Sequence, residues 1–172
     1  MGELNVLGLE FGTDKVGHHY CFYYERHLDS LRRTPMRLLE IGVLAGASLR
    51  MWEAYFPLGQ ITGVDIAPEI VYITDRVTTV TCDVKDFTPS RLYDVVIDDG
   101  SHQWPDIIEA HTRLWPAVVP GGWYVIEDLD VQQHGLPVFG LIAYTVEALA
   151  HELGDVGELH VYNQIAFLRK RP

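Results

Sequence analysis

Short apolar runs alternate with amphipathic stretches along most of the chain after residue 35. The apolar runs predict five buried strands, over residues 36–42, 60–66, 77–83, 93–99 and 123–129. Apolar positions at helical spacing predict helices over residues 47–56, 67–75, 106–119 and 138–153. Five strands separated by helices indicate a mostly parallel sheet with helices on both faces, and so an α/β protein.

The last stretch has a different pattern. Residues 158–170 are almost entirely strand-like, and Asn163 and Gln164 interrupt them near the middle, which predicts an antiparallel hairpin. A parallel sheet that ends in such a hairpin resembles the Rossmann-like class I methyltransferase fold. We therefore expect a single catalytic domain over residues 1–172, in which a helical or lid segment (1–35) precedes the Rossmann-like core (36–172).

Composition and charge restrict the possible partners. The 172 residues are 48% hydrophobic and 22% charged, as in a folded soluble domain. A net charge of −11 argues against nucleic acid as the main partner and suits a small neutral or cationic ligand better. Apolar runs of membrane-spanning length, a signal peptide and a cysteine framework are all missing from the sequence, so we expect a cytoplasmic protein that does not bind membranes.

Polar and glycine residues follow the first three predicted strands, where open α/β sheets bind their ligands. They are Glu40, Gly42, Gly46 and Ser48 after the first strand, Asp65 after the second and Asp83 after the third. The glycines would let a ligand approach the backbone, Asp65 is spaced to accept ribose hydroxyls, and Asp83 can meet an adenine edge.

Two cofactors fit this edge of the sheet. Gly42 and Gly46 form GxxxG and not the dinucleotide fingerprint GxGxxG, and a glycine turn is often only a packing feature. The negative charge of Glu40 is unfavourable beside a pyrophosphate but suits the cationic aminoacyl end of S-adenosylmethionine. We therefore favour S-adenosylmethionine as the methyl donor over NAD, and a methyltransferase over an NAD-binding oxidoreductase.

Acidic residues end the fourth and fifth strands, in "IDDGSH" (97–102) and "IEDL" (126–129). Crowded carboxylates suit a hard cation such as Mg²⁺, which can orient an acceptor hydroxyl, and His102 can accept the proton of that hydroxyl. The alternative is a turn in which Asp98, Asp99 and Ser101 only cap the next helix. The residues alone leave both interpretations open.

Four strings resemble the metal-dependent sugar O-methyltransferases of macrolide biosynthesis. They are "FGTDK", "LLEIGVLAGASLRMWEAYFPLGQITGVDI", "YDVVIDDGSH" and "PGGWYVIEDL", and the resemblance runs from about residue 11 to residue 130. It implies S-adenosylmethionine and Mg²⁺ as cofactors and a hydroxyl of a sugar or another small natural product as acceptor. It also implies Asp99, Glu127 and Asp128 as metal ligands, His102 as general base, and Glu40, Ser48 and Asp65 as donor-binding residues.

The chain departs from this family at both ends. It begins just before "GTDK" and has a short region after Asp128, so we expect little more than the catalytic domain. A donor-binding module without activity of its own, or a homo-oligomer that completes the site, therefore remains an alternative to an independent enzyme.

Some polar and aromatic residues have uncertain roles. The aromatic-rich stretch 11–28 would be either a lid, with Thr13 and Lys15 near the donor, or an amphipathic helix whose aromatic side chains join the core. His111 is expected to be structural, and His134 is a weaker candidate for a residue that faces the acceptor. Trp104 would either line a pocket or anchor its helix.

Overall fold

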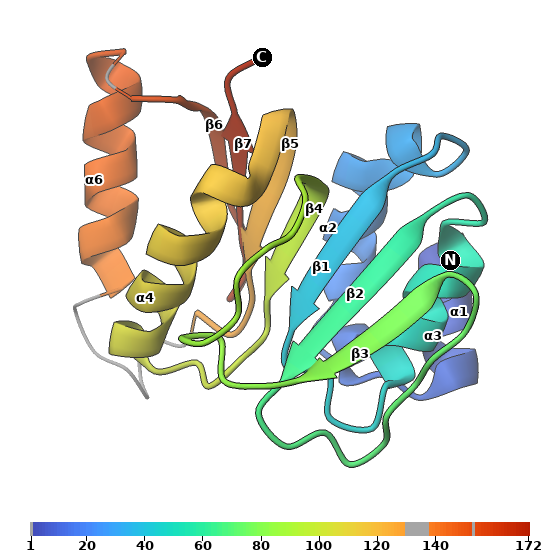
Figure 1. The fold of residues 1–172 in the computed structure, drawn as a ribbon. Coiled ribbons are helices and arrows are strands. Elements are labelled where there is room, and N and C mark those ends of the chain that lie inside the picture. Colours follow the sequence, from blue (N-terminus) through green and yellow to red (C-terminus); the bar gives the residue numbers. More distant parts are fainter. Residues whose placement is uncertain (1, 130–137, 153) are drawn as a thin grey trace. The chain divides into compact units, whose positions relative to one another are not determined.

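The computed structural model describes residues 2–129, 138–152 and 154–172 (Figure 1). The chain divides into two compact units, and the boundary between them in the sequence lies between Asp83 and Val84. Among the described residues, no helix is both long enough and apolar enough to cross a membrane.

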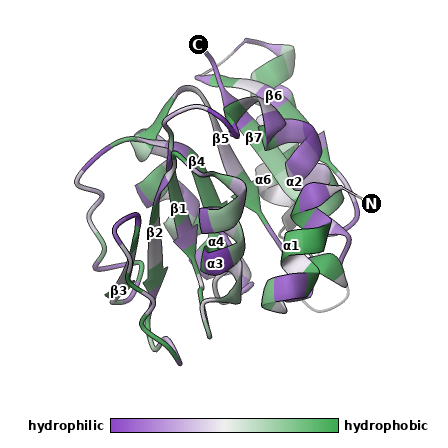
Figure 2. Ribbon diagram, turned by 90° about the vertical axis from the view of Figure 1, so that its right-hand side faces the viewer, coloured by the Kyte–Doolittle hydropathy of each residue, from purple (hydrophilic) through white to green (hydrophobic). Residues whose placement is uncertain are grey.

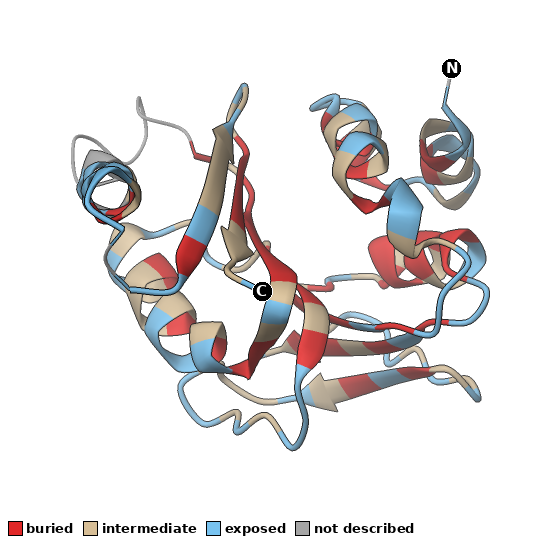
Figure 3. Cartoon of the chain, turned by 90° about the horizontal axis from the view of Figure 1, so that it is seen from above, coloured by how far each residue is buried: buried red, intermediate tan, exposed pale blue. Residues whose placement is uncertain are grey.

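Unit 1 is a three-stranded parallel sheet with helices packed against it. Its elements are α1 (Glu3–Phe11), α2 (Tyr20–Leu28), β1 (Arg37–Ile41), α3 (Ala47–Tyr55), β2 (Gln60–Asp65) and β3 (Val77–Thr81). β2 lies between β1 and β3, and Glu40 pairs with Gly63 in the register of β1 and β2. The helix α3 contacts both β2 and α1 and is largely buried, as Figure 3 shows. The predicted strands over 36–42, 60–66 and 77–83 are confirmed to within two residues at each end.

The aromatic-rich N-terminal stretch contributes side chains to the core of this unit. Tyr20 and Tyr24 in α2 are buried, and the Tyr24 ring packs edge-on against Trp52 of α3, with 4.9 Å between centroids. His18 and His19 are exposed. The preceding helix α1 also carries both hydrophobic and hydrophilic residues, as the colours of Figure 2 show. The structure therefore favours the amphipathic-helix interpretation of residues 11–28 over a lid.

The prediction of a helix over residues 67–75 is wrong, because this segment forms bends and irregular structure instead. The Tyr72 N–H donates to Oγ1 of Thr79 at 3.1 Å, and the Thr79 hydroxyl donates back to the Tyr72 carbonyl at 2.7 Å. The Glu69 N–H donates to the carbonyl of Leu44 at 2.9 Å. These bonds to β3 and to the loop after β1 replace the bonds of a helix, a tertiary effect that helical spacing does not reveal.

Unit 2 combines parallel strands with the final hairpin. Its elements are β4 (Tyr93–Asp98), α4 (Trp104–Leu114), β5 (Val118–Ile126), α6 (Val138–Ala150), β6 (Val156–Val161) and β7 (Ala166–Lys170). β4 and β5 are parallel, whereas β7 pairs antiparallel with both β5 and β6. The Tyr162 N–H donates to the Ile165 carbonyl across the turn, so the predicted hairpin is confirmed. In Figure 1, α4 and α6 run along the strands of this unit.

β5 begins five residues before its predicted start at residue 123. The helix before it ends at Leu114, because Pro116 has no N–H to donate and follows in a short 3-10 turn. Gly121 has φ 77° within "VVPGG", and the register between β4 and β5 shifts there. The sequence "PGG" therefore forms an irregular part of the strand and not a helix stop.

Candidate active site

Glu40 lies near the end of β1 with its side chain fully buried. Its Oε2 accepts a hydrogen bond from the Ser48 hydroxyl at 2.7 Å, and its Oε1 accepts one from Trp52 Nε1 at 3.1 Å. Nζ of Lys15, itself 1% exposed, lies 3.3 Å from Oε1. The charge of Glu40 is therefore compensated inside unit 1.

Trp52 is a residue that the sequence analysis missed. It follows Ser48 by four positions in α3, so both side chains lie on the same helix face, toward Glu40. This spacing beside a buried acidic residue is the signal that could have identified it.

Asp65 ends β2 and binds the loop that follows β1. Its Oδ2 accepts the backbone N–H groups of Val43 and Leu44, both at 2.9 Å, and its Oδ1 accepts the N–H of Ala67 at 2.8 Å. Burial acts to raise the pKa of Asp65, but the three N–H donors outweigh it and lower this pKa below the ordinary value. Asp65 thus fixes the glycine turn and stays ionised.

The two glycines of this turn have backbone conformations that glycine favours. Gly42 has φ 82°, and Gly46 has φ 72° at the residue before α3. A methyl group on Gly46 would lie 3.4 Å from Cβ of Tyr72, an ordinary contact, so the backbone and not crowding explains this glycine.

The remaining donor-site candidates of unit 1 lie near the same strand ends. Thr13 is 8% exposed, and its Oγ1 accepts the Lys15 N–H at 3.5 Å, which caps the turn that positions Lys15 beside Glu40. Asp83 follows β3 and is half-buried, and the N–H of its neighbour Cys82 donates to the Asp65 carbonyl at 3.0 Å.

In unit 2 the structure brings Asp99, His102 and Asp128 together. One ligand atom from each, a carboxylate oxygen or a ring nitrogen, lies within 4.8 Å of the other two, and all three residues are half-buried. His102 Nε2 is 3.4 Å from Asp128 Oδ2. A carboxylate oxygen of the buried Glu127 also lies within 4.8 Å of one of Asp99. The four residues thus lie at the carboxyl ends of β4 and β5, as the sequence predicted.

Two of these residues have left-handed backbone conformations. His102 has φ 58° and Asp128 has φ 53°, a region that costs free energy for residues other than glycine but that His and Asp adopt more often than most. At Asp128 the strand has already ended, so its side chain is released from the alternation that would point it away from Glu127.

Ser101, by contrast, belongs to the start of α4. Its hydroxyl accepts the N–H of Gln103 at 3.2 Å and donates to Asp106 Oδ2 at 2.6 Å. Lys85 Nζ lies 3.2 Å from the other oxygen of Asp106. Ser101 therefore stabilises the turn before α4, although the N-cap residue of this helix is Gln103, whereas Asp99 and His102 belong to the acidic group.

Asp98 is 5% exposed and faces the interior of unit 2. Its Oδ2 accepts the Tyr124 hydroxyl at 3.3 Å. Burial raises the pKa of Asp98 to about 7, although the N–H of Gly100 and the Tyr124 hydroxyl act to lower it. The carboxyl of Asp98 thus faces the buried Tyr124, whereas that of Asp99 lies in the acidic group.

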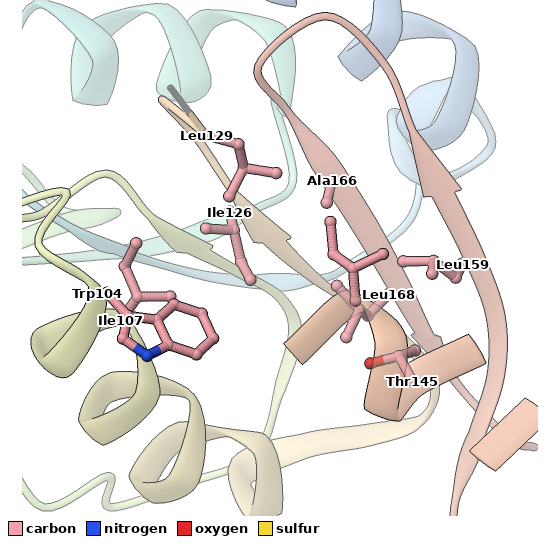
Figure 4. Close-up of a pocket in the computed structure, with 9 residues that line it drawn as sticks. Trp104, Ile107, Ile126, Leu129, Thr145, Leu159, Ala166 and Leu168 are labelled. Atoms are coloured by element: carbon pink, nitrogen blue, oxygen red, sulfur yellow. The ribbon is translucent and has the colours of Figure 1, made fainter. Parts of the chain in front are cut away.

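An apolar pocket of about 270 Å³, including space open to solvent, lies between the helices and strands of unit 2 (Figure 4). Trp104 and Ile107 line it from α4, and Leu129 lines it beside the acidic group. Trp104 therefore both lines a pocket and begins its helix. His111 stacks on Trp115 inside the unit, as expected for a structural residue, and His134 lies outside the described residues.

Comparison with known proteins identifies close relatives. No family model matches the chain. Mycinamicin VI 2''-O-methyltransferase of Micromonospora griseorubida is 34% identical over 98% of this chain and 52% of its own length. Demethylmacrocin O-methyltransferase of Streptomyces fradiae is 35% identical over 98% of this chain and 53% of its own length. The chain thus spans about half the length of the curated relatives it matches, and both alignments are longer than its 172 residues, so the relatives carry insertions.

A solved structure gives the same result. The MycE methyltransferase of the mycinamycin pathway, in complex with Mg, S-adenosylhomocysteine and mycinamycin VI, has a TM-score of 0.87 and 33% identity. The match covers 99% of this chain and 54% of that one. The predicted family resemblance and fold class are both confirmed. The chain has the class I methyltransferase fold and is homologous, over nearly all of its residues, to the sugar O-methyltransferases of macrolide biosynthesis.

Proposed function

We propose that the chain transfers a methyl group from S-adenosylmethionine to a hydroxyl of a sugar in a small natural product, with the help of Mg²⁺. The observation that carries the proposal is the convergence of Asp99, His102 and Asp128 at the ends of two neighbouring strands. The homology to proteins named as O-methyltransferases of mycinamicin VI and demethylmacrocin supports the same reaction.

Unit 1 supplies the donor site in this proposal. The Asp65 carboxylate is held at the end of β2 by three backbone N–H donors, and it retains acceptor capacity for the hydroxyl groups of a ribose. Gly42 and Gly46 leave the backbone of the turn open to the donor. Glu40, Ser48 and Lys15 form a buried, bonded group at the end of β1 in this proposed site, and Thr13 and Asp83 are further candidates for it.

The acidic residues of unit 2 have the chemistry of a Mg²⁺ site. Asp99, Asp128 and Glu127 offer the carboxylate oxygens that this hard cation prefers, and Asp99 lies within 4.8 Å of Asp128 in one group and of Glu127 in another. Their mutual repulsion is a cost that a bound cation removes. When bound, the ion would orient the acceptor hydroxyl and lower the pKa of that hydroxyl.

His102 acts as the general base in this proposal. Its Nε2 lies 3.4 Å from Asp128 Oδ2, so the carboxylate can stabilise the imidazolium that forms when His102 takes the hydroxyl proton. Because the sulfonium donor is already activated, holding the acceptor oxygen in line with the methyl group accounts for much of the rate.

Replacement of His102 tests this role. His102→Ala should lower methyl transfer by about 10²- to 10⁴-fold, the usual contribution of general base catalysis, while S-adenosylhomocysteine binding is retained. His160→Ala is the matched control, because His160 Nε2 lies 3.0 Å from Glu158 Oε2 at similar exposure elsewhere in unit 2. Equal activity of the two variants, measured with the same glycoside, would refute His102 as the base.

A further inference from the structure

Asp98 connects the ends of β4 and β5 through both its backbone and its side chain. Its carbonyl accepts the N–H of Glu127 at 3.0 Å, and its Oδ2 accepts the hydroxyl of Tyr124 at 3.3 Å. Asp99 is the next residue in the chain, and Asp128 follows Glu127. Both bonds of Asp98 therefore act on the two segments that carry the proposed metal ligands.

The partner of Asp98 is rigidly held. Tyr124 is fully buried, and its ring packs edge-on against His111 of α4, with 5.0 Å between centroids. The ring of Trp115 also packs edge-on against the Tyr124 ring, with 6.4 Å between centroids. The Tyr124 hydroxyl thus has a fixed position, from which it donates to a carboxyl group that is itself only 5% exposed.

The alternation of side chains along a strand separates this pair from the metal ligands. Tyr124 and Ile126 point to the face of the strands that α4 covers, and Asp98 points to the same face. Asp99 and Glu127 are each one residue further along their segments and approach one another within 4.8 Å. Asp98 and Tyr124 therefore face the side of the strands that α4 covers, whereas the alternation directs Glu127 to the other side.

We propose that Asp98 and Tyr124 form a clamp that fixes the spacing between Asp99 and the Glu127–Asp128 pair and so sets the affinity for a divalent cation. Both are positioning residues, which act through the residues beside them. The inference rests on the proposed function, since it assumes that the acidic group binds an ion. It concerns ion binding alone and not the transfer of a methyl group.

The clamp has a measurable consequence. Ligand distances in metal sites are set within about 0.2 Å, so loosening one strand end against the other weakens binding even when every ligand remains. Loss of a residue that supports metal ligands typically lowers affinity by about 10- to 100-fold. We expect Tyr124→Phe, which removes a single hydroxyl, to weaken Mg²⁺ binding within that range.

The protein offers a closely matched control. Tyr55 is also fully buried, and its hydroxyl donates to a carboxylate oxygen of Asp29, likewise at 3.3 Å. Tyr55→Phe therefore removes the same group from the same kind of hydrogen bond inside unit 1. Both variants should lose some thermal stability, but only Tyr124→Phe should lose Mg²⁺ affinity.

The experiment is a calorimetric titration of Mg²⁺ into the wild type and the two variants, with S-adenosylhomocysteine titrated separately. Weaker Mg²⁺ binding by Tyr124→Phe alone, with unchanged S-adenosylhomocysteine binding, supports the clamp. Asp98→Asn, which retains an acceptor for the hydroxyl, should stay closer to wild type than Asp98→Leu.

Three results would overturn the inference, and a fourth would bear only on the proposed function. Wild-type Mg²⁺ affinity in Tyr124→Phe, or an equal loss in Tyr55→Phe, would contradict the clamp and leave the proposed function intact. A wild type that binds no Mg²⁺ would contradict the clamp together with the metal part of that function. A wild type that binds Mg²⁺ through the clamp but transfers no methyl group would contradict only the proposed function.

Discussion

Polar residues at the carboxyl ends of strands carry the candidate chemistry of both units. Asp65, Asp99 and His102 follow apolar runs that predict strands, and a parallel sheet places such residues at one edge of the sheet. Lys15 was expected near the donor, but its burial beside Glu40 depends on a contact between distant segments of unit 1. The periodicity of a sequence contains no information about such a contact.

The buried pair of Lys15 and Glu40 gives the first prediction for stability. Lys15→Met should lower the free energy of unfolding by about 3–5 kcal/mol, because Glu40 is left buried without its cation. The control is Lys85→Met, which breaks an ion pair that is 52% and 37% exposed and should cost less than about 1 kcal/mol. Urea denaturation measures both. Equal losses would show that burial does not set the strength of the pair.

His111 gives a prediction for pH. Burial lowers the pKa of His111 to about 4, and its Nε2 is buried with no hydrogen-bond partner among the described residues. The unfolded chain protonates this histidine near its ordinary pKa of 6.5, so between pH 6.5 and 4 the unfolded state holds more protons. The contribution of His111 to stability therefore falls as the pH falls through this range.

His111→Phe isolates this effect, because it removes the titration and keeps an aromatic ring. The raised pKa of Asp98, about 7, changes stability in the opposite direction over the whole of this range, but the wild type and the variant both contain Asp98, so its effect cancels in their difference. The variant should therefore gain on the order of 3 kcal/mol relative to wild type between pH 7 and pH 4. A difference in unfolding free energy that is independent of pH would show that folding does not lower the pKa of His111.

At the scale of elements, the strands were predictable and the connections were less so. β1 to β4 begin and end within two residues of their predicted bounds, since continuous apolar runs mark buried parallel strands. The prediction of a helix over 67–75 was wrong, because the backbone of this segment bonds to Thr79 and Leu44 instead of forming the bonds of a helix. The predicted start of β5 was also wrong. The strand begins earlier, because Gly121 adopts a positive φ and the strand continues through "PGG".

The turn between β1 and α3 gives a prediction at this scale. Gly46→Ala should cost about 1–2 kcal/mol of stability, because φ 72° is unfavourable for alanine, and should weaken S-adenosylhomocysteine binding by covering the backbone of the turn. Gly121→Ala is the control, since φ 77° imposes the same strain in unit 2. Calorimetric titration should show at least about tenfold weaker binding for Gly46→Ala alone. Unchanged binding would mean that the donor does not approach this turn.

For the whole molecule, the homology and the arrangement of residues within each unit both support the proposed methyl transfer. Unit 1 holds the glycine turn and Asp65, and unit 2 holds the carboxylates and His102. The acceptor was the least predictable part, because the chain spans about half the length of its curated relatives and their alignments contain insertions. The residues that would select a sugar therefore cannot be transferred one by one.

The most direct test of this account is the transfer of labelled methyl groups from S-adenosylmethionine to a panel of deoxysugar glycosides that includes mycinamicin VI. The account predicts a labelled glycoside that forms with Mg²⁺, disappears in excess chelator and returns when Mg²⁺ is restored. Transfer at full rate in excess chelator would contradict the role of the metal. Binding of both the donor and Mg²⁺ with no transfer to any glycoside would contradict the proposed activity and indicate a donor-binding module instead.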